Sequence, residues 1–258
     1  MNIPSQNRFV HTHESLTCGT CEKMLPVAVN YCPACGVRVN NWVSQELKWL
    51  YPLLIYFFLD LLVICIYKYS DLVEDTFENM LYADGIISSI TLIFVAFYYN
   101  DLIAIFKLQT LRLKPLVKII ALLVAGAVVV NFLANYISQA LYEEIYYYTL
   151  IFTDYPYPVL YAILFVCLQP AIFEELAFRG FLFTFVEKLS SPKTAILVTA
   201  LLFGIMHMDL IALLWLLPLG YVFGYFRYKY KSIWYGVIGH FVYNLVILLF
   251  EFKDLYFS

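Results

Sequence analysis

Seven apolar runs separated by polar loops limit what this chain can fold into more than any other feature of its sequence. A helix needs about 20 apolar residues to cross about 30 Å of hydrocarbon, and most of the runs approach that length. The hydrophobic content of 63% and the charged content of 14% also lie outside the usual range of soluble domains. We therefore predict an all-α polytopic membrane protein with about seven transmembrane helices. The runs cover residues 49–67, 85–106, 116–137, 159–185, 195–208, 210–226 and 234–250.

The charges of the connecting loops alternate in sign along the chain, which tests the number of spans independently of hydropathy. Cytosolic loops are enriched in Lys and Arg, so this pattern predicts a cytosolic N-terminus and a C-terminus on the other side of the membrane, the plasma membrane if the protein is bacterial. The basic groups are Arg8, Lys23, Arg38 and Lys48; Lys107, Arg112, Lys114 and Lys118; Lys188 and Lys193; Arg227, Lys229 and Lys231. The acidic groups are Asp71, Glu74, Asp75, Glu78 and Asp84; Glu143, Glu144 and Asp154; and Asp209 alone.

Four cysteines of the polar N-terminal segment form two CxxC pairs, Cys18 with Cys21 and Cys32 with Cys35. Two such pairs, separated by a short loop, can present four thiolates to one tetrahedral Zn²⁺. We therefore predict a zinc ribbon with structural zinc over residues 1–41. This segment lacks the apolar stretch of a signal peptide and is expected in the cytosol, where thiols stay reduced; two disulfides are the alternative.

The fourth apolar run contains charged residues near its middle, at Glu174, Glu175 and Arg179. Placing a charged side chain in hydrocarbon costs free energy, so such residues usually have a functional or structural role. Glu175 and Arg179 are four residues apart and share a helix face, whereas Glu174 points about 100° away. Arg179 can thus neutralise Glu175, and Glu174 remains the better candidate for a general base. Pro170 is expected to kink this helix and free a carbonyl group.

Two further pairs of residues at helical spacing follow in later apolar runs. Phe203 and His207 are four residues apart in the fifth run, and His240 and Asn244 are four apart in the seventh. Each pair projects from one face of its helix. An imidazole beside Glu174 can help to hold and deprotonate water, and donors such as His240 and Asn244 can stabilise an oxyanion, as acyl transfer requires.

The three motifs, in this order, resemble the signature of the CAAX protease and bacteriocin-processing family of intramembrane endopeptidases. The resemblance covers roughly residues 159–250 and leaves out the ribbon and the first three spans, so we divide the chain into 1–41, 42–156 and a catalytic core at 157–258. It implies an all-helical, metal-independent peptidase with a conical cavity and no catalytic cofactor. Glu174 and His207 would activate water, His240 and Asn244 would form the oxyanion hole, and Glu175 and Arg179 would have supporting or secondary catalytic roles.

Plainer interpretations of the same residues remain open. The charged residues of the fourth run can form a purely structural ionic network, and the glutamates and histidines can ligate a catalytic zinc. Asp60, near the centre of the first run, is interpreted as a structural hydrogen-bonding residue or a contact to another subunit. Asn131 and Asn135 are interpreted as hydrogen-bonding residues between helices.

The sequence thus supports competing functions. The first is a peptidase that acts on a membrane-embedded or lipidated peptide or protein, with membrane lipid around it and a cytosolic protein as partner of the ribbon. The second is a non-proteolytic membrane scaffold or bacteriocin self-immunity protein of the same fold. A transporter is disfavoured because no inverted repeat is visible. No basic block long enough to grip phosphates occurs, so nucleic acid is not an expected partner.

Overall fold

The computed structural model describes residues 18, 20–24, 31–37, 42–70, 73–74, 76–108, 111–142 and 147–257. The chain forms two compact units, Met1–Trp49 and Leu50–Ser258. The first unit holds the paired cysteines, and the second holds all three polar motifs. Some residues of the predicted charge pattern lie outside the described residues, namely Arg8, Arg38, Asp71, Asp75, Glu143 and Glu144.

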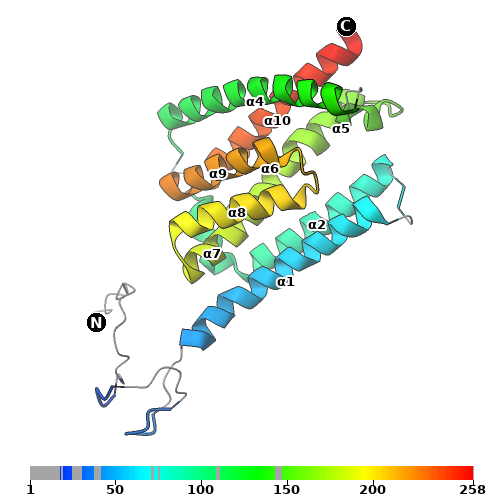
Figure 1. The fold of residues 1–258 in the computed structure, drawn as a ribbon. Coiled ribbons are helices and arrows are strands. Elements are labelled where there is room, and N and C mark those ends of the chain that lie inside the picture. Colours follow the sequence, from blue (N-terminus) through cyan, green and yellow to red (C-terminus); the bar gives the residue numbers. More distant parts are fainter. Residues whose placement is uncertain are drawn as a thin grey trace. The chain divides into compact units, whose positions relative to one another are not determined.

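All seven apolar runs are helical, and the described part of the chain has the predicted all-α architecture (Figure 1). The first run lies in α1 (Trp42–Tyr69) and the third in α4 (Leu113–Tyr142). The second run begins in α2 (Phe77–Phe97) and continues through α3 (Tyr99–Leu102) and η1 (Ile103–Phe106). The last three lie in α8 (Pro192–Met206), α9 (Leu213–Tyr230) and α10 (Trp234–Phe257). The fourth run lies in one long helical segment, Pro158–Leu189. The short element η3 (Tyr148–Phe152) precedes the fourth segment.

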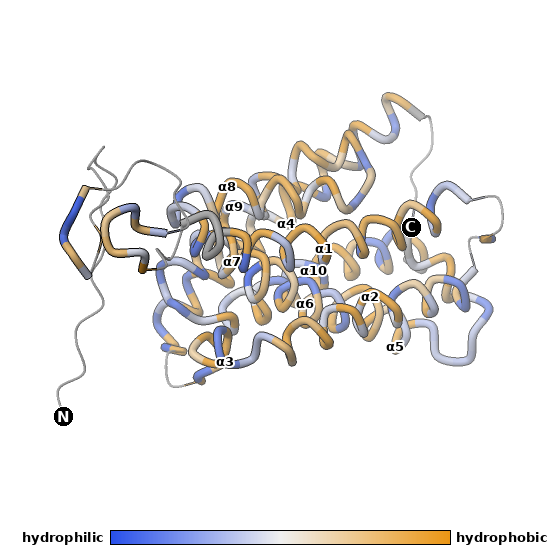
Figure 2. The backbone as a smooth tube through the Cα atoms, turned by 90° about the horizontal axis from the view of Figure 1, so that it is seen from below, coloured by the Kyte–Doolittle hydropathy of each residue, from blue (hydrophilic) through white to orange (hydrophobic). Residues whose placement is uncertain are grey.

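Five of the described helices are long and apolar enough to cross a membrane, and apolar residues run along them (Figure 2). They are Leu47–Tyr69, Phe77–Phe97, Leu113–Leu141, Pro158–Leu189 and Trp234–Leu255. The other two predicted spans are shorter or more polar. Helix α8 is apolar but has 15 residues, about 22 Å at 1.5 Å per residue. Helix α9 has 18 residues and carries two basic residues in its last turn. The chain is an integral membrane protein.

Helices α8 and α9 pack closely through small residues, side by side in Figure 1. A Cβ atom on Gly220 of α9 would lie 3.0 Å from the Cα atom of Ala200 of α8. One turn later, a Cβ atom on Gly224 would lie 3.4 Å from the Cα atom of Ile196. Small residues allow such close approach of helix backbones in membranes. The pair thereby brings Phe203 of α8 and Phe223 of α9 to the same buried region, where both rings face the Arg179 guanidinium.

Polar contacts between the ends of different helices show which helix ends lie on the same side of the bundle. On one side, Lys188 pairs with Asp101, and the Trp234 indole N–H donates to the Phe106 carbonyl at 2.9 Å. These contacts join the ends of the second and fourth runs to the start of the seventh. Lys231, after the sixth run, lies 3.3 Å from Glu187 on the same side.

The other side of the bundle is defined by two contacts. The hydroxyl of Tyr155, just before the fourth segment, donates to the Glu78 carboxylate at the start of α2. The ammonium group of Lys68, at the end of α1, donates to the His207 carbonyl at the end of α8. This grouping of helix ends is the one that alternating spans require.

Many of the charged residues that we placed in loops lie within helices instead, and Asp84 and Arg227 are two of them. Asp84 is in the second turn of α2, which begins eight residues before the apolar run because polar residues extend the helix beyond it. Arg227 is buried in α9, where its guanidinium bonds to backbone and side-chain oxygens of the fourth segment. Neither residue therefore contributes to the charge of a loop.

Aromatic side chains pack α1 and α2 against the fourth segment. The ring of Phe181 lies 5.0 Å from the ring of Tyr56 in α1 and 5.4 Å from that of Phe94 in α2. The hydroxyl groups of Tyr56 and Thr91 form a hydrogen bond of 2.9 Å between α1 and α2. The first two helices thus support the helix that carries the two adjacent glutamates.

Candidate active site

The helical segment that carries the glutamates departs twice from α geometry. It consists of α5 (Pro158–Ala162), η4 (Ile163–Leu168), α6 (Gln169–Glu174), η5 (Glu175–Leu182) and α7 (Phe183–Leu189). Elements η4 and η5 are π-helices, whose wider turns are often found at functional sites. The predicted distortion is therefore present at Pro170, which lies inside this continuous segment just after η4 and has no N–H to donate to the Val166 carbonyl four residues earlier.

The predicted pair of Glu175 and Arg179 forms in the interior of the bundle. The Nη1 atom of Arg179 lies 2.9 Å from Oε1 of Glu175, and both side chains are fully buried. Breaking such a pair leaves an uncompensated charge in an apolar region, which is strongly destabilising. Glu175 is therefore held in place and neutralised by its own helix.

Further contacts fix Arg179 in a cage formed mainly by α8 and α9. Its Nη2 atom donates to the Gly220 carbonyl at 3.2 Å. Its guanidinium lies 4.6 Å from the ring centre of Phe203 and 5.1 Å from that of Phe223, within the range of cation–π attraction. The backbone carbonyl of Arg179 accepts a hydrogen bond of 3.0 Å from Nε of Arg227. Side chain and backbone of this π-helical residue are thus both held from α9.

His240 lies between the two glutamates. Its Nδ1 atom is 3.5 Å from Oε1 of Glu175, and its Nε2 atom is 3.8 Å from Oε2 of Glu174. The imidazole is buried and stacks on Phe223, with ring centres 5.3 Å apart. Its nitrogens are slightly too far for hydrogen bonds, but both face carboxylates. The ring therefore connects the buried glutamate electrostatically to its neighbour.

Glu174 is the accessible member of the two glutamates. Its side chain is 31% exposed, whereas that of Glu175 is 0% exposed. The Oε2 atom of Glu174 is nevertheless buried and has no hydrogen-bond partner. A carboxylate that is open on one side and unpaired on the other can accept a proton from a bound water.

His207 lies at the end of α8 and faces Phe203, as its spacing predicted. The Nδ1 atom of His207 is 2.9 Å from the Phe203 carbonyl oxygen, and the two rings meet edge to face with centres 4.8 Å apart. The Phe203 ring is in turn 6.2 Å from the His240 ring. No hydrogen bond or ion pair joins His207 to either glutamate in the part of the chain that the structure describes. The two histidines are connected through Phe203.

Asn244 uses one of its amide N–H groups to hold the other π-helix. Its Nδ2 atom donates to the Val166 carbonyl of η4 at 2.8 Å. The second N–H of the same amide remains as a donor, because a carboxamide carries two. Of the six predicted catalytic residues, the structure therefore brings Glu174, Glu175, Arg179 and His240 close together. His207 and Asn244 lie at the edge of this group.

Residues beyond the predicted set also shape the site. Gly236 leaves the space that the Glu175 carboxylate fills, and Arg227 holds the Arg179 carbonyl. A small residue one turn before His240 was a signal for the first, but nothing in the sequence distinguished Arg227 from a loop cation. Asp60 is buried in α1, and its Oδ1 atom has no hydrogen-bond partner.

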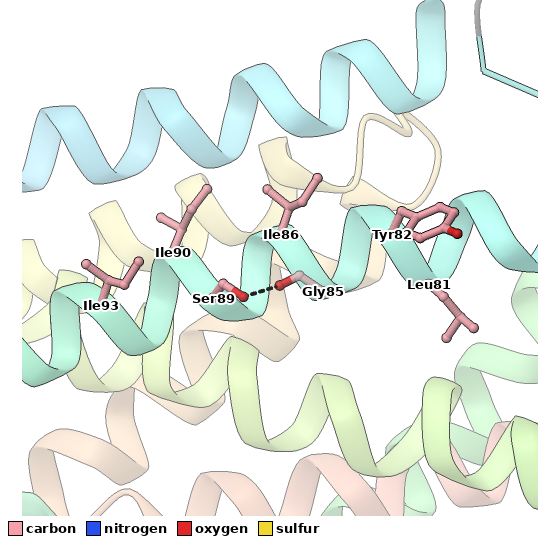
Figure 3. Close-up of a pocket in the computed structure, with 7 residues that line it drawn as sticks. All are labelled: Leu81, Tyr82, Gly85, Ile86, Ser89, Ile90 and Ile93. Atoms are coloured by element: carbon pink, nitrogen blue, oxygen red, sulfur yellow. Dashed lines mark hydrogen bonds between the residues drawn. The ribbon is translucent and has the colours of Figure 1, made fainter.

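An apolar groove on α2 is separate from this site. It has a volume of about 470 Å³, and Figure 3 shows Ile86, Ile90 and Ile93 projecting from one face of the helix. The remaining lining residues are Leu81, Tyr82, Gly85 and Ser89. The lining contains no carboxylate or imidazole and so offers no general base.

In the first unit, the four paired cysteines converge as a metal site requires. The sulfur atoms lie within 4.8 Å of one another, and the distances from Cys18 to Cys35 and from Cys21 to Cys32 are 3.6 Å. Tetrahedral Zn²⁺ with bonds of about 2.3 Å places its sulfur ligands about 3.8 Å apart. A disulfide bond is only about 2.0 Å long, so the alternative of two disulfides does not fit. Backbone N–H groups of Thr20 and Cys21 lower the pKa of Cys18 to about 6, whereas hydrogen bonding to Cys35 raises the pKa of Cys21 to about 12.

The two cysteine turns repeat one backbone pattern. The Cys18 N–H donates to the Lys23 carbonyl, and the Glu22 N–H donates to the Cys18 carbonyl. Cys32 makes the same pair of bonds with Val37 and Gly36. The fourth residue after the first cysteine is left-handed in both turns, with φ of 58° at Glu22 and 69° at Gly36. This set of residues fits one bound metal ion.

The geometry of the second unit can be compared with known proteins. Residues 156–246, which contain all seven motif residues, match the family described as type II CAAX prenyl endopeptidase Rce1-like. This family match covers about a third of the chain. The chain is also 26% identical over 190 residues to a Bacillus subtilis (strain 168) protein named "Putative membrane peptidase YdiL", a match that covers 70% of this chain and 77% of that protein. No solved structure matches the chain.

The family match confirms the resemblance that the three motifs indicated. The matched Rce1-like segment begins just before Pro158 and ends within α10, so it includes the whole fourth segment, α8 and α9. Both comparisons support a membrane peptidase. The cysteine turns and helices α1 and α2 precede the Rce1-like segment.

Proposed function

We propose that this protein is a glutamate-dependent, metal-independent intramembrane endopeptidase in which Glu174 is the general base. The observation that carries the proposal is the different state of two adjacent carboxylates. Glu175 is fully buried and paired with Arg179, whereas Glu174 is 31% exposed and has no cationic partner on its own helix. Of the two glutamates, only Glu174 has access to water.

In the proposed reaction, Glu174 takes a proton from a water molecule whose oxygen attacks the peptide carbonyl carbon. The tetrahedral intermediate then collapses, the carbon–nitrogen bond breaks, and Glu174 returns the proton to the leaving amine. His240, whose Nε2 atom lies 3.8 Å from Oε2 of Glu174, is proposed to stabilise the negative charge of the intermediate. The free amide N–H of Asn244 is the second proposed donor. His207 is proposed to position the water together with Glu174.

The positions of the potential metal ligands support a proposal of catalysis without a metal. The four cysteines are the group among the described residues whose ligand atoms converge as a metal site requires. In the second unit, His240 lies within 3.8 Å of both glutamates, but the Arg179 guanidinium already pairs with Glu175 at 2.9 Å. We assign zinc to the cysteines as a structural ion and propose that the ribbon binds a cytosolic protein.

We propose a membrane-embedded or lipidated peptide or protein as substrate, because the site lies among helices that cross the bilayer. A suitable probe is a quenched fluorogenic peptide that ends in a prenylated CAAX sequence, tested with purified protein in liposomes. Glu174→Gln should abolish cleavage, whereas Glu187→Gln, a matched change near the end of the same segment, should leave it intact. Cleavage by Glu174→Gln at the wild-type rate would contradict the proposal, and a cellular phenotype that survives it would favour the scaffold or self-immunity function.

A chelator separates metal-independent from metal-dependent catalysis. Treatment that strips zinc from the cysteines, measured by metal analysis, should leave cleavage of the probe by the liposome-embedded protein within about twofold of the untreated rate. Loss of cleavage in a Cys18→Ser, Cys21→Ser variant as well as in the treated wild type would point to a requirement for the ribbon. Loss confined to the treated wild type would indicate a catalytic metal.

We further propose that the N-terminus and the side of the bundle that holds Lys188 and Lys231 face the cytosol. A cysteine introduced in place of Lys114 should react with an impermeant maleimide only after the membrane is opened. A cysteine in place of Asp154 should react in intact cells. The reverse pattern would invert the topology.

A further inference from the structure

The end of α8 has an unusual connection to a helix outside the family-matched segment. The last carbonyl groups of an α-helix lack partners within the helix. His207 follows the last residue of α8, and the chain then turns out of the helix at Met208, which has a φ of 50°. The His207 carbonyl accepts a hydrogen bond of 2.8 Å from Nζ of Lys68. A lysine at this position also interacts favourably with the negative end of the α8 dipole.

Lys68 belongs to the last turn of α1, and α1 is held against the core at two places. Tyr56 packs on Phe181 of η5, and its hydroxyl bonds to Thr91 of α2. Twelve residues of helix, about 18 Å, separate Tyr56 from Lys68. The same helix therefore contacts the segment with the glutamates at one level and the end of α8 at another.

The hydrogen bond from Lys68 to the His207 backbone also restricts the position of the His207 ring. The Nδ1 atom of His207 is bonded to the Phe203 carbonyl one turn earlier, so the ring orientation follows the last turn of α8. Displacement of this turn would move Phe203 and the imidazole together relative to His240, whose ring lies 6.2 Å from that of Phe203. Fixing the His207 carbonyl therefore fixes the place of the imidazole.

We propose that Lys68 is a positioning residue for His207, contributed to the site by α1. This inference rests on the proposed function, in which His207 orients the attacking water. Lys68 does not touch the glutamates or His240; it acts on catalysis through the end of α8. The opposing view is that Lys68 makes an exposed contact of the kind that contributes nothing measurable.

Three variants distinguish the two views, with the prenylated fluorogenic peptide as probe. Lys68→Met removes the donor, Lys68→Arg keeps one, and Lys193→Met removes an exposed lysine from the start of α8 as a control. We expect Lys68→Met to lower kcat about tenfold with KM within about twofold, because a misplaced catalytic group affects turnover more than binding. Lys68→Arg should recover most of kcat, and Lys193→Met should match the wild type.

A second measurement does not depend on activity. In a Glu174→Gln background, His207 should react at least about twofold faster with diethyl pyrocarbonate when Lys68 is replaced by Met, because freeing the last turn exposes the ring. Mass spectrometry of the His207 peptide gives the rate. Unchanged kcat together with unchanged His207 reactivity in Lys68→Met would overturn the proposal. If the probe is not cleaved by the wild type, the proposed function fails, and the reactivity of His207 alone decides the role of Lys68.

Discussion

A Cβ atom on Gly236 would lie 2.1 Å from Oε2 of Glu175, so the missing side chain of Gly236 provides the space that the buried carboxylate occupies. Gly236 lies one turn before His240 on α10, and His240 faces the same carboxylate. The two residues of α10 therefore contact Glu175 from one helix face.

Gly236→Ala should therefore displace Glu175 and weaken its pair with Arg179. We expect cleavage of the fluorogenic peptide to fall at least about tenfold and the melting temperature to drop by several degrees, because a core clash typically costs about 1–3 kcal/mol. Gly126→Ala in α4 is the control, since a Cβ atom there meets nothing within 4 Å. It should keep full activity and gain slightly in stability. Wild-type cleavage and melting temperature of Gly236→Ala would show that neither activity nor stability depends on the present position of Glu175.

The pair of Glu175 and Arg179 makes a prediction about coupling. Arg179→Met leaves the fully buried Glu175 without its cation and should destabilise the protein by about 3–5 kcal/mol. Glu175→Leu combined with Arg179→Met removes both charges and should regain most of that stability while cleavage stays low. Thermal unfolding in detergent of both single variants and the double variant measures the coupling. A double variant as unstable as the sum of the single ones would disprove it.

Arg227 is expected to matter for activity although it lies one helix away from the glutamates. Arg227→Met removes the donor to the Arg179 carbonyl in η5 and leaves a buried acceptor unpaired, at a cost of about 1–3 kcal/mol. We expect lower melting temperature and lower kcat. Lys229→Met, two residues later on the exposed surface, is the matched control and should leave both quantities unchanged. Equal effects of the two substitutions would point to loss of positive charge rather than of the hydrogen bond.

The repeated cysteine turns predict a stabilising substitution. Glu22 has the left-handed backbone that Gly36 has in the second turn, and this conformation costs a non-glycine residue about 1 kcal/mol. Glu22→Gly should therefore raise the apparent zinc affinity about fivefold, since metal binding and folding of such modules are coupled. Competition with a chromophoric chelator measures the affinity. Glu22→Asn, which also tolerates this conformation, controls for the lost charge and should give a smaller gain in the same direction.

The positions of the helices could be predicted from the sequence because each apolar run must be buried in hydrocarbon or protein. The pair of Glu175 and Arg179 followed from helical spacing alone, and the convergence of the four cysteines followed from their motif. In these cases the determining interactions are local in the chain.

The remaining features of the site depend on how helices pack, which spacing does not specify. His240 was expected beside Asn244 as an oxyanion donor, but the rotation of α10 places its ring between Glu174 and Glu175. The two π-helices arise where tertiary contacts satisfy freed carbonyl groups, from Arg227 at Arg179 and from Asn244 at Val166. Such contacts join residues far apart in the chain and leave no local signal.

The two π-helices also make the arrangement of side chains around the fourth segment depend on its number of residues. Each wide turn takes up residues that a regular helix would place elsewhere, so positions before and after Glu175–Leu182 do not share one helical wheel. Deleting one residue between Glu175 and Arg179 would replace the wide turn by regular turns and shorten the spacing of this ion pair from four residues to three. A change of a single residue in length, with every motif residue retained, would thus be enough to take the site apart.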